Sequence, residues 1–191
     1  LLLLVFSVLY VFLFYIFFEA ILIPMFILIG IWGSRERKIR AVYLLFFYTL
    51  FGSLLMLVGL LYIYTVTGTL NLEYLLAYKF TMEEQCWLWL AFFLSFASKI
   101  PMFPFHVWLP EAHVEAPTGG SVVLAAVMLK LGAYSFMRFA MPIAPEAAIY
   151  LKDFMVTLSL IAILYIALIA IVQKDMKKLI AYSSISHMGF V

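Results

Sequence analysis

The chain has 191 residues, of which 68% are hydrophobic and only 12% are charged, and its mean hydropathy is +1.15. A soluble domain is about half apolar and about a quarter charged, so this composition excludes a soluble fold and predicts a polytopic membrane protein. The net charge of +2 gives no reason to expect nucleic acid as a partner. A single cysteine, Cys86, excludes an internal disulfide, and the absence of nucleotide-binding and zinc-protease motifs predicts no cofactor and no metal.

Hydrophobic runs divide the chain into five expected membrane spans, since one span takes about 20 residues. The first run, residues 1–33, is too long for one helix and too short for two. We split it into the stub of an earlier helix over residues 1–9 and a span over 10–33. The other spans are expected over residues 41–68, 86–106, 118–138 and 154–172, with a partial sixth helix over 179–191. All belong to one membrane domain, 1–191.

The charged connections between these spans predict the orientation, because Lys and Arg gather on the cytoplasmic side of a membrane. One side receives Arg35, Arg37, Lys38, Arg40, Lys174, Lys177 and Lys178, and the other receives Lys79, Arg138 and Lys152. The first side is therefore cytoplasmic or, in an organelle, matrix, and it also receives a polar connection over residues 107–117. The sequence lacks an initiator methionine and ends within a helical pattern, so we expect an internal piece of a longer chain.

Three ionisable side chains lie inside the expected spans. Glu19 and Lys130 fall near the middle, and Lys99 lies about 6 Å past the centre of its helix. Each costs roughly 3 kcal/mol to insert, about 9 kcal/mol together, and such groups normally face a bundle interior and mark ion or proton paths. Two alternatives stay open: Lys99 could reach to the near interface, and Glu19 or Lys130 could belong to a purely structural ion pair.

Prolines interrupt the helices beside two of these groups. Pro24 lies five residues after Glu19 and frees one helical carbonyl, four residues before it. Pro101 and Pro104 follow Lys99 and free two more in the same way. Freed carbonyls at membrane depth need a polar partner, and at the end of a half-helix they favour an ammonium group. Because transporters place broken helices at the midplane, this pattern predicts a transport site at Lys99.

The three histidines have different expected roles. His106, at the broken end of the third span, and His187, near the end of the chain, are candidate secondary proton relays because histidine titrates near neutral pH. His113 lies between Glu111 and Glu115, and we expect it to be solvated or to cap a helix. No pair of histidines is expected on facing helices at matching depth, which disfavours haem.

Residues 98–117 read SKIPMFPFHVWLPEAHVEAP. This stretch resembles the signature of the subunit 4 family of the NADH dehydrogenase (ubiquinone) of respiratory complex I, whose members are proton-pumping, antiporter-like membrane subunits. The resemblance covers nearly the whole chain and continues at residues 18–25 (FEAILIPM), 129–132 (LKLG) and 177–188 (KKLIAYSSISHM). Tyr10 departs from the pattern, because the family often has an acidic residue about nine positions before the glutamate.

The resemblance implies an all-α integral membrane fold. It is an antiporter-like helix bundle with the first five-helix inverted repeat, including its proline-broken helix, and the start of the second repeat. The resemblance also implies that Glu19 and Lys99 face each other, with Lys130 as the central relay and His106 and His187 as lesser members of the polar axis. The second broken helix and its terminal titratable residue are not in this sequence, so we expect the exit half of the path to lie outside it.

The function implied by the resemblance is that of a non-redox membrane subunit of proton-translocating NADH:ubiquinone reductase, in the mitochondrial inner membrane or the bacterial plasma membrane. The implied partners are other membrane subunits of complex I, including neighbouring antiporter-like subunits, and lipids, without nucleic acid. Two alternatives stay open: a subunit of a multisubunit cation/proton antiporter, and a structural membrane subunit that does not pump.

The expected mechanism rests on the pair of Glu19 and Lys99. At a separation of about 8 Å and an effective dielectric of ~20, the pair is worth about 2 kcal/mol. Pairing retains the proton on Lys99, and moving or neutralising Glu19 releases it through water toward Lys130. We expect all three ionisable groups to turn away from lipid, and regular helical hydrogen bonding to be lost between about Lys99 and Phe105.

Overall fold

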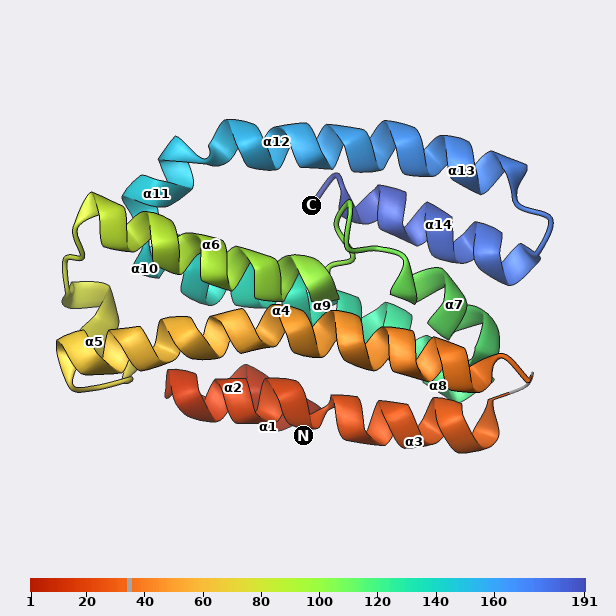
Figure 1. Ribbon diagram of the computed structural model, residues 1–191, viewed down its shortest axis with the longest axis horizontal. Coiled ribbons are helices and arrows are strands. Elements are labelled where there is room, and N and C mark those ends of the chain that lie inside the picture. Colours follow the sequence, from red (N-terminus) through yellow and green to blue (C-terminus); the bar gives the residue numbers. More distant parts are fainter. Residues whose placement is uncertain (34–35) are drawn as a thin grey trace.

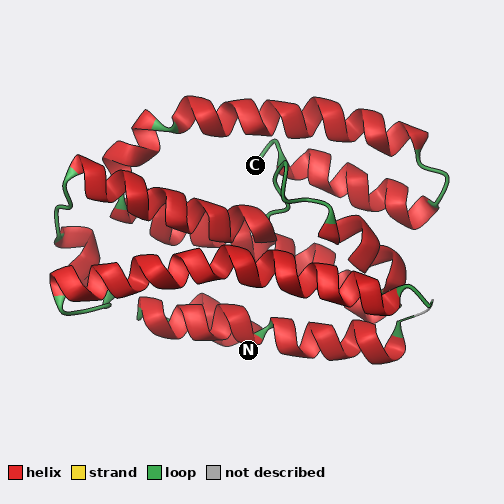
Figure 2. Ribbon diagram, viewed as in Figure 1, coloured by secondary structure: helices red, strands yellow, loops and turns green. Residues whose placement is uncertain are grey.

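The computed structural model describes residues 1–33 and 36–191, so Arg35, which enters the charge count above, lies outside the described residues. The described residues form helices joined by short connections, and no strand occurs among them (Figure 2). The expected all-α membrane fold is confirmed. Its helices run back and forth along the long axis of the molecule (Figure 1).

The N-terminal run divides where the chain becomes extended. α1 (Leu2–Ser7) ends before Tyr10, which forms an isolated antiparallel bridge with Asn71. The N–H of Val11 donates to the carbonyl of Leu70 at 3.0 Å. A distant segment therefore supplies the backbone partners that a continuous helix would have supplied.

Four helical stretches among the described residues are long and apolar enough to cross a membrane: Val11–Trp32, Lys38–Thr67, Thr118–Ile143 and Lys152–Val172. The first consists of α2 (Val11–Ala20) and α3 (Leu22–Trp32), and the second is α4 (Lys38–Thr67). The third contains α8 (Thr118–Val123), η1 (Leu124–Met128), α9 (Leu129–Ser135), η2 (Phe136–Ala140) and α10 (Met141–Ile143). The fourth contains α12 (Lys152–Ile161), η3 (Ala162–Ile166) and α13 (Ala167–Val172), where η marks a π-helical turn.

α6 (Met82–Lys99) corresponds to the third expected span but is not among these four, because its 18 residues include Glu83, Glu84 and Lys99. It begins with a capping box, in which the N–H of Thr81 donates to Oε2 of Glu84 at 2.8 Å. That α6 crosses the membrane stays a prediction. The remaining helices are α5 (Leu72–Ala77), α7 (Trp108–Glu115), α11 (Pro145–Tyr150) and α14 (Met176–Met188).

α4 lies in the middle of the bundle and packs against α2, α3, α6 and α7. It approaches α6 closely at Gly52, where a Cβ atom would lie 2.6 Å from Oγ of Ser98 and 2.9 Å from the carbonyl oxygen of Leu94. Only glycine fits there without a shift of backbone. The last turn of α6 is therefore held tightly against α4.

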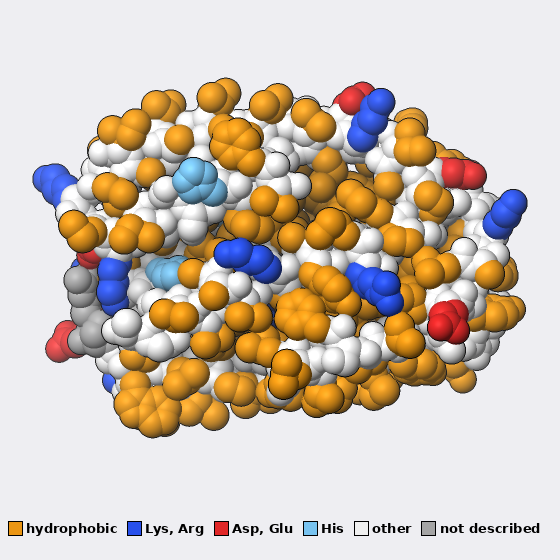
Figure 3. Space-filling model, turned by 180° about the vertical axis from the view of Figure 1, so that it is seen from behind, with side chains coloured by type: hydrophobic (Ala, Val, Ile, Leu, Met, Phe, Trp, Pro, Cys, Tyr) orange, Lys and Arg blue, Asp and Glu red, His pale blue; other side chains and the backbone are white. Residues whose placement is uncertain are grey.

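The four long helical stretches run between two opposite ends of the bundle (Figure 1). The C-terminal end of α7 and the α13–α14 connection lie at one end, and α5 and α11 lie at the other. Hydrophobic side chains cover most of the face seen from behind, but Lys or Arg side chains stand among them in its middle (Figure 3).

Candidate functional site

Lys99 is the last residue of α6, and its side chain is only 2% exposed. Its Nζ lies 3.6 Å from Oε1 of Glu19 on α2. The same atom donates a hydrogen bond of 2.6 Å to the carbonyl oxygen of Phe18 and lies 3.5 Å from the centre of the Phe18 ring. An ion pair, a charge-assisted hydrogen bond and a cation–π contact therefore surround one buried ammonium group, which does not reach to an interface.

Glu19 is the acidic partner of this ion pair, and its carboxylate accepts no hydrogen bond from the described residues. Its side chain is 17% exposed, and neither carboxylate oxygen has a hydrogen-bond partner in the part of the chain that the structure describes. The separation of 3.6 Å is beyond ordinary hydrogen-bond length but shorter than the 8 Å expected above. At an effective dielectric of ~20 this raises the attraction to about 5 kcal/mol. The carboxylate is thus held by charge and packing, and no hydrogen bond from the described residues fixes its position.

The carbonyl that accepts from Lys99 lies where the first long helix is interrupted. α2 ends at Ala20, α3 begins at Leu22, and Pro24 stands in the first turn of α3. A proline cannot donate to the carbonyl four residues before it, which weakens helical hydrogen bonding around this point. The carbonyl freed by Pro24 is that of Ala20, and the carbonyl of Phe18, two residues earlier, accepts from the side chain of Lys99 on another helix.

α6 and α7 are separated by residues 100–107, which are not helical and include Pro101 and Pro104. The carbonyl of Ala97, four residues before Pro101, accepts from the N–H of Met102 at 3.0 Å. The carbonyl of Ser98 accepts from Nε1 of the buried Trp108 at 2.7 Å. The chain itself therefore satisfies these carbonyls, and the Trp108 bond ties the start of α7 to the turn that carries Lys99.

Gly132 on α9 lies against the last turn of α6, next to the break. A Cβ atom at Gly132 would lie 2.6 Å from Cγ1 of Ile100, 3.1 Å from the Ile100 nitrogen and 3.2 Å from the Phe96 carbonyl oxygen. Two of these three atoms belong to the backbone, so they cannot turn aside as a side chain can. The absent side chain of Gly132 lets α9 touch the last turn of α6.

Lys130 lies two residues before Gly132 but faces outward. Its side chain is exposed in this chain, and its Nζ donates to the carbonyl of Ala125 at 2.7 Å, within the same helix. The π-helical turn η1 ends two residues before Lys130, and such a distortion often marks functional sites. Thus the structure brings Glu19 and Lys99 together but leaves Lys130 on the outer surface, as it does Arg138 on η2. The structure therefore buries the pair within the bundle, and the expectation that Lys130 also turns away from lipid stays a prediction.

The histidines lie at three different places. His106 is buried in the break with its Nδ1 unpaired, and its ring stacks on Phe103 with the ring centres 5.8 Å apart. His187 is exposed on α14, beside a shallow hollow that Ala167 and Ser183 help to line. His113 is half-buried in the last turn of α7, and its buried Nε2 has no hydrogen-bond partner among the described residues. This disfavours the solvated side chain expected from the sequence but agrees with the alternative of a group at the helix end.

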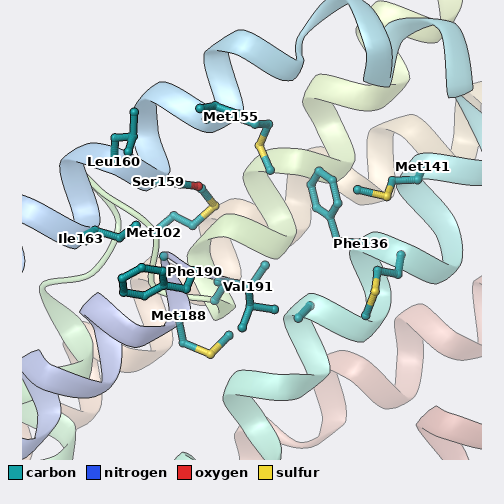
Figure 4. A pocket seen from close by; sticks show the side chains of 15 residues that line it. Met102, Phe136, Met141, Met155, Ser159, Leu160, Ile163, Met188, Phe190 and Val191 are labelled. Atoms are coloured by element: carbon teal, nitrogen blue, oxygen red, sulfur yellow. The ribbon is translucent and has the colours of Figure 1, made fainter.

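An apolar cavity of about 440 Å³ opens beside the break, between the third and fourth long helices and α14 (Figure 4). Figure 4 shows Met102, Met155, Met188 and Phe190 around it. Ser159 alone, among the described residues that line it, carries a polar side chain.

Three supporting features were not predicted from the sequence: the Phe18 contacts of Lys99, the Trp108 bond to α6 and the close approach at Gly132. The first two join residues whose pairing no local pattern encodes. Gly132 belongs to the motif at residues 129–132, but only its contact with α6 shows why a side chain would not fit there. The described residues bring no three His, Cys, Asp or Glu side chains together as a metal site would need.

Two interrupted helices that enclose a buried ion pair, within a bundle of apolar helices, define a membrane protein of the transport class. The family described as "NADH:quinone oxidoreductase/Mrp antiporter, TM" matches residues 9–191, and the chain belongs to this family.

The curated relatives agree with this assignment. The chain is 60% identical to NADH-ubiquinone oxidoreductase chain 4 of Chondrus crispus over 98% of its length, and 62% identical to that of Prototheca wickerhamii over all of it. It spans 38% and 36% of the length of these two relatives. The match therefore concerns little more than a third of each relative.

Two solved structures have the same fold. A chain of respiratory complex I from Thermus thermophilus with bound NADH matches with a TM-score of 0.89 and 40% identity, over 97% of this chain and 40% of that one. A chain of the membrane-bound sulfane sulfur reductase, an archaeal respiratory membrane complex, matches with a TM-score of 0.81 and 26% identity, over 93% and 37%. The antiporter-like helix bundle expected from the sequence is confirmed.

Proposed function

We propose that this chain carries protons across the membrane as part of subunit 4 of NADH:ubiquinone oxidoreductase, acting as a non-redox membrane component of that enzyme. The observation that most supports this proposal is the ion pair of Glu19 and Lys99, buried where two interrupted helices meet. The family and the relatives named above support the complex, the mitochondrial inner membrane or bacterial plasma membrane as its location, and other membrane subunits as partners.

Each ionisable residue has its own part in the proposed path. Lys99 holds the proton, Glu19 controls whether Lys99 keeps it, and Lys130 passes it on. His106 is a lesser relay within the break, which its buried, unpaired Nδ1 supports. His187 is a lesser relay on α14, in keeping with its exposure to water or to neighbouring subunits.

The proposed mechanism uses the absence of hydrogen bonds on Glu19. While the carboxylate lies 3.6 Å from the amine, their attraction stabilises the charged form of Lys99, so the proton stays. If the carboxylate moves away or gains a proton, the buried ammonium loses its compensating charge and gives up its proton. The prolines at 24, 101 and 104 keep both helices interrupted, which lets the pair open without breaking a continuous helix.

Transfer to Lys130 requires a route along the outer surface of α9. Because Lys130 and Arg138 are exposed in this chain, we place neighbouring helices of the assembled complex over that face, with water between them and Lys130. An uncovered ammonium group in the middle of a lipid-facing helix would cost roughly 3 kcal/mol. This cost favours a covered path over a lysine in contact with lipid.

The test is the substitution Glu19→Gln in the assembled complex, with electron transfer and proton translocation measured separately. The amide keeps the shape of the side chain but removes its charge, so we expect fewer protons to be moved per electron pair. Glu36→Gln, a change of the same charge at an exposed connection, is the control and should leave this ratio unchanged. Full proton translocation in Glu19→Gln would mean that the pair only fixes helix packing, and the structural alternative would then hold.

A further inference from the structure

The short helix α7 is the piece of the broken span that the proposed mechanism does not use. It begins directly after the break, and its first residue, Trp108, is only 1% exposed. Nε1 of Trp108 donates to the carbonyl of Ser98, the residue before Lys99. An eight-residue helix is about 12 Å long and does not bend easily. Whatever holds the far end of α7 therefore also positions the turn that carries Lys99.

At its C-terminal end, α7 lacks some of the backbone N–H groups that would donate to its last carbonyls if the helix continued. A C-terminal helix end leaves several carbonyls without intrahelical partners. The usual donor to the carbonyl of His113 would be the N–H of residue 117, but Pro117 has none. Oγ of Ser121 approaches that carbonyl instead, at 3.4 Å. The next carbonyls need donors from elsewhere.

Those donors come from a single side chain, 61 to 63 residues further along the chain. Nζ of Lys177, in the first turn of α14, donates to the carbonyl oxygens of Val114 at 3.3 Å and Ala116 at 3.2 Å. An ammonium group at the C-terminal end of a helix also interacts favourably with the helix dipole. Lys178 makes a second contact between the same two helices, an ion pair with Glu111 at 2.8 Å in which both side chains are 25% exposed. Lys177 is itself exposed, so its effect on α7 comes from its two hydrogen bonds at the helix end and not from burial.

We propose that Lys177 is a positioning residue: by capping the C-terminal end of α7, it holds the Lys99 turn in place through α7 and the Trp108 bond. The inference rests on the proposed function and extends it to α14, a helix distant in sequence from the ion pair. Movement of α14 along its axis would be passed to Lys99 by this route. Lys177 itself stays charged and passes no proton to another group in this scheme.

The test compares Lys177→Met with Lys177→Arg in the assembled complex. Methionine has a similar length but cannot donate, whereas arginine keeps both the charge and the donors. We expect the number of protons moved per electron pair to fall in Lys177→Met, because the donors to the end of α7 are lost, and to be retained in Lys177→Arg. Hydrogen exchange of the backbone amides over residues 108–116 should become faster in the first variant only.

Lys174→Met is the matched control, because Lys174 is an exposed lysine in the same connection. An unchanged proton ratio in Lys177→Met, or a loss of equal size in Lys174→Met, would overturn the proposal. If Lys177→Met does not assemble, Lys177→Gln replaces it and must lower the ratio while Lys177→Arg keeps it. Lys99→Met separates the two hypotheses. Normal proton translocation in Lys99→Met would contradict the proposed function. Lost translocation in Lys99→Met together with a normal proton ratio in Lys177→Met would contradict only the role of Lys177.

Discussion

Lys99→Met in the assembled complex is expected to abolish the proton translocation that we propose for this chain. Methionine fills nearly the same space as the buried lysine but has no proton to give. The electrostatic partner at Glu19 and the acceptor at Phe18 would both lose the ammonium group, which contacts each of them. Proton uptake and electron transfer, measured in the same vesicles, should show a lower proton ratio even where electron transfer persists.

The double variant Glu19→Gln with Lys99→Met decides whether the pair is structural. Removing one partner of a buried ion pair is expected to cost about 3 to 5 kcal/mol of stability, because the other charge is left uncompensated. Removing both partners relieves that penalty, so the double variant should assemble better than Lys99→Met alone. We expect its proton ratio to remain low. Recovery of both assembly and pumping would show that the chain uses the pair for packing alone.

Gly132→Leu is expected to lower the thermal stability of the complex and to displace the break. The new Cβ would meet the Ile100 nitrogen at 3.1 Å and the Phe96 carbonyl oxygen at 3.2 Å, and the rest of the leucine would have no room. Overpacking of this kind costs about 1 to 3 kcal/mol or more when backbone must move. Because the displaced atoms belong to the last turn of α6, the proton ratio should fall together with the stability.

Gly119→Ala is the control for this substitution. Gly119 lies on α8, in the same long helix, and a Cβ atom there meets nothing within 4 Å. We expect a change in unfolding free energy within about 0.5 kcal/mol and an unchanged proton ratio. The measurements are thermal unfolding of the purified complex and proton uptake in vesicles. Equal stability of the Gly132→Leu and Gly119→Ala variants would contradict the close packing of α9 against α6.

The break after Lys99 illustrates what could be predicted from local sequence. A proline lacks the N–H that a helix needs and restricts its own backbone, so Pro101 and Pro104 predict an interrupted helix whatever surrounds them. The structure accordingly has no helix over residues 100–107. The polar connection expected over residues 107–117, by contrast, contains α7, because Trp108 and other apolar side chains of that stretch are buried against the bundle.

The ion pair shows what could be predicted only in part. The insertion cost of a charge in hydrocarbon indicates that Glu19 and Lys99 must find polar surroundings, and the family resemblance suggests that they face each other. Their separation, the Phe18 carbonyl and the unpaired carboxylate oxygens depend on how two distant helices cross. Such contacts join residues about 80 positions apart, and no periodicity in either helix encodes them.

The sequence alone therefore determined the membrane class, the all-α fold and the position of the break, because each follows from hydropathy or from proline stereochemistry. The tertiary structure decided which ionisable groups meet. It buries Lys99 against Glu19, and it leaves Lys130, which has the same side chain in an equally apolar stretch, on the exposed side of its helix. The physical reason is that insertion cost depends on the residue and its depth, whereas pairing depends on which face of each helix the packing turns inward.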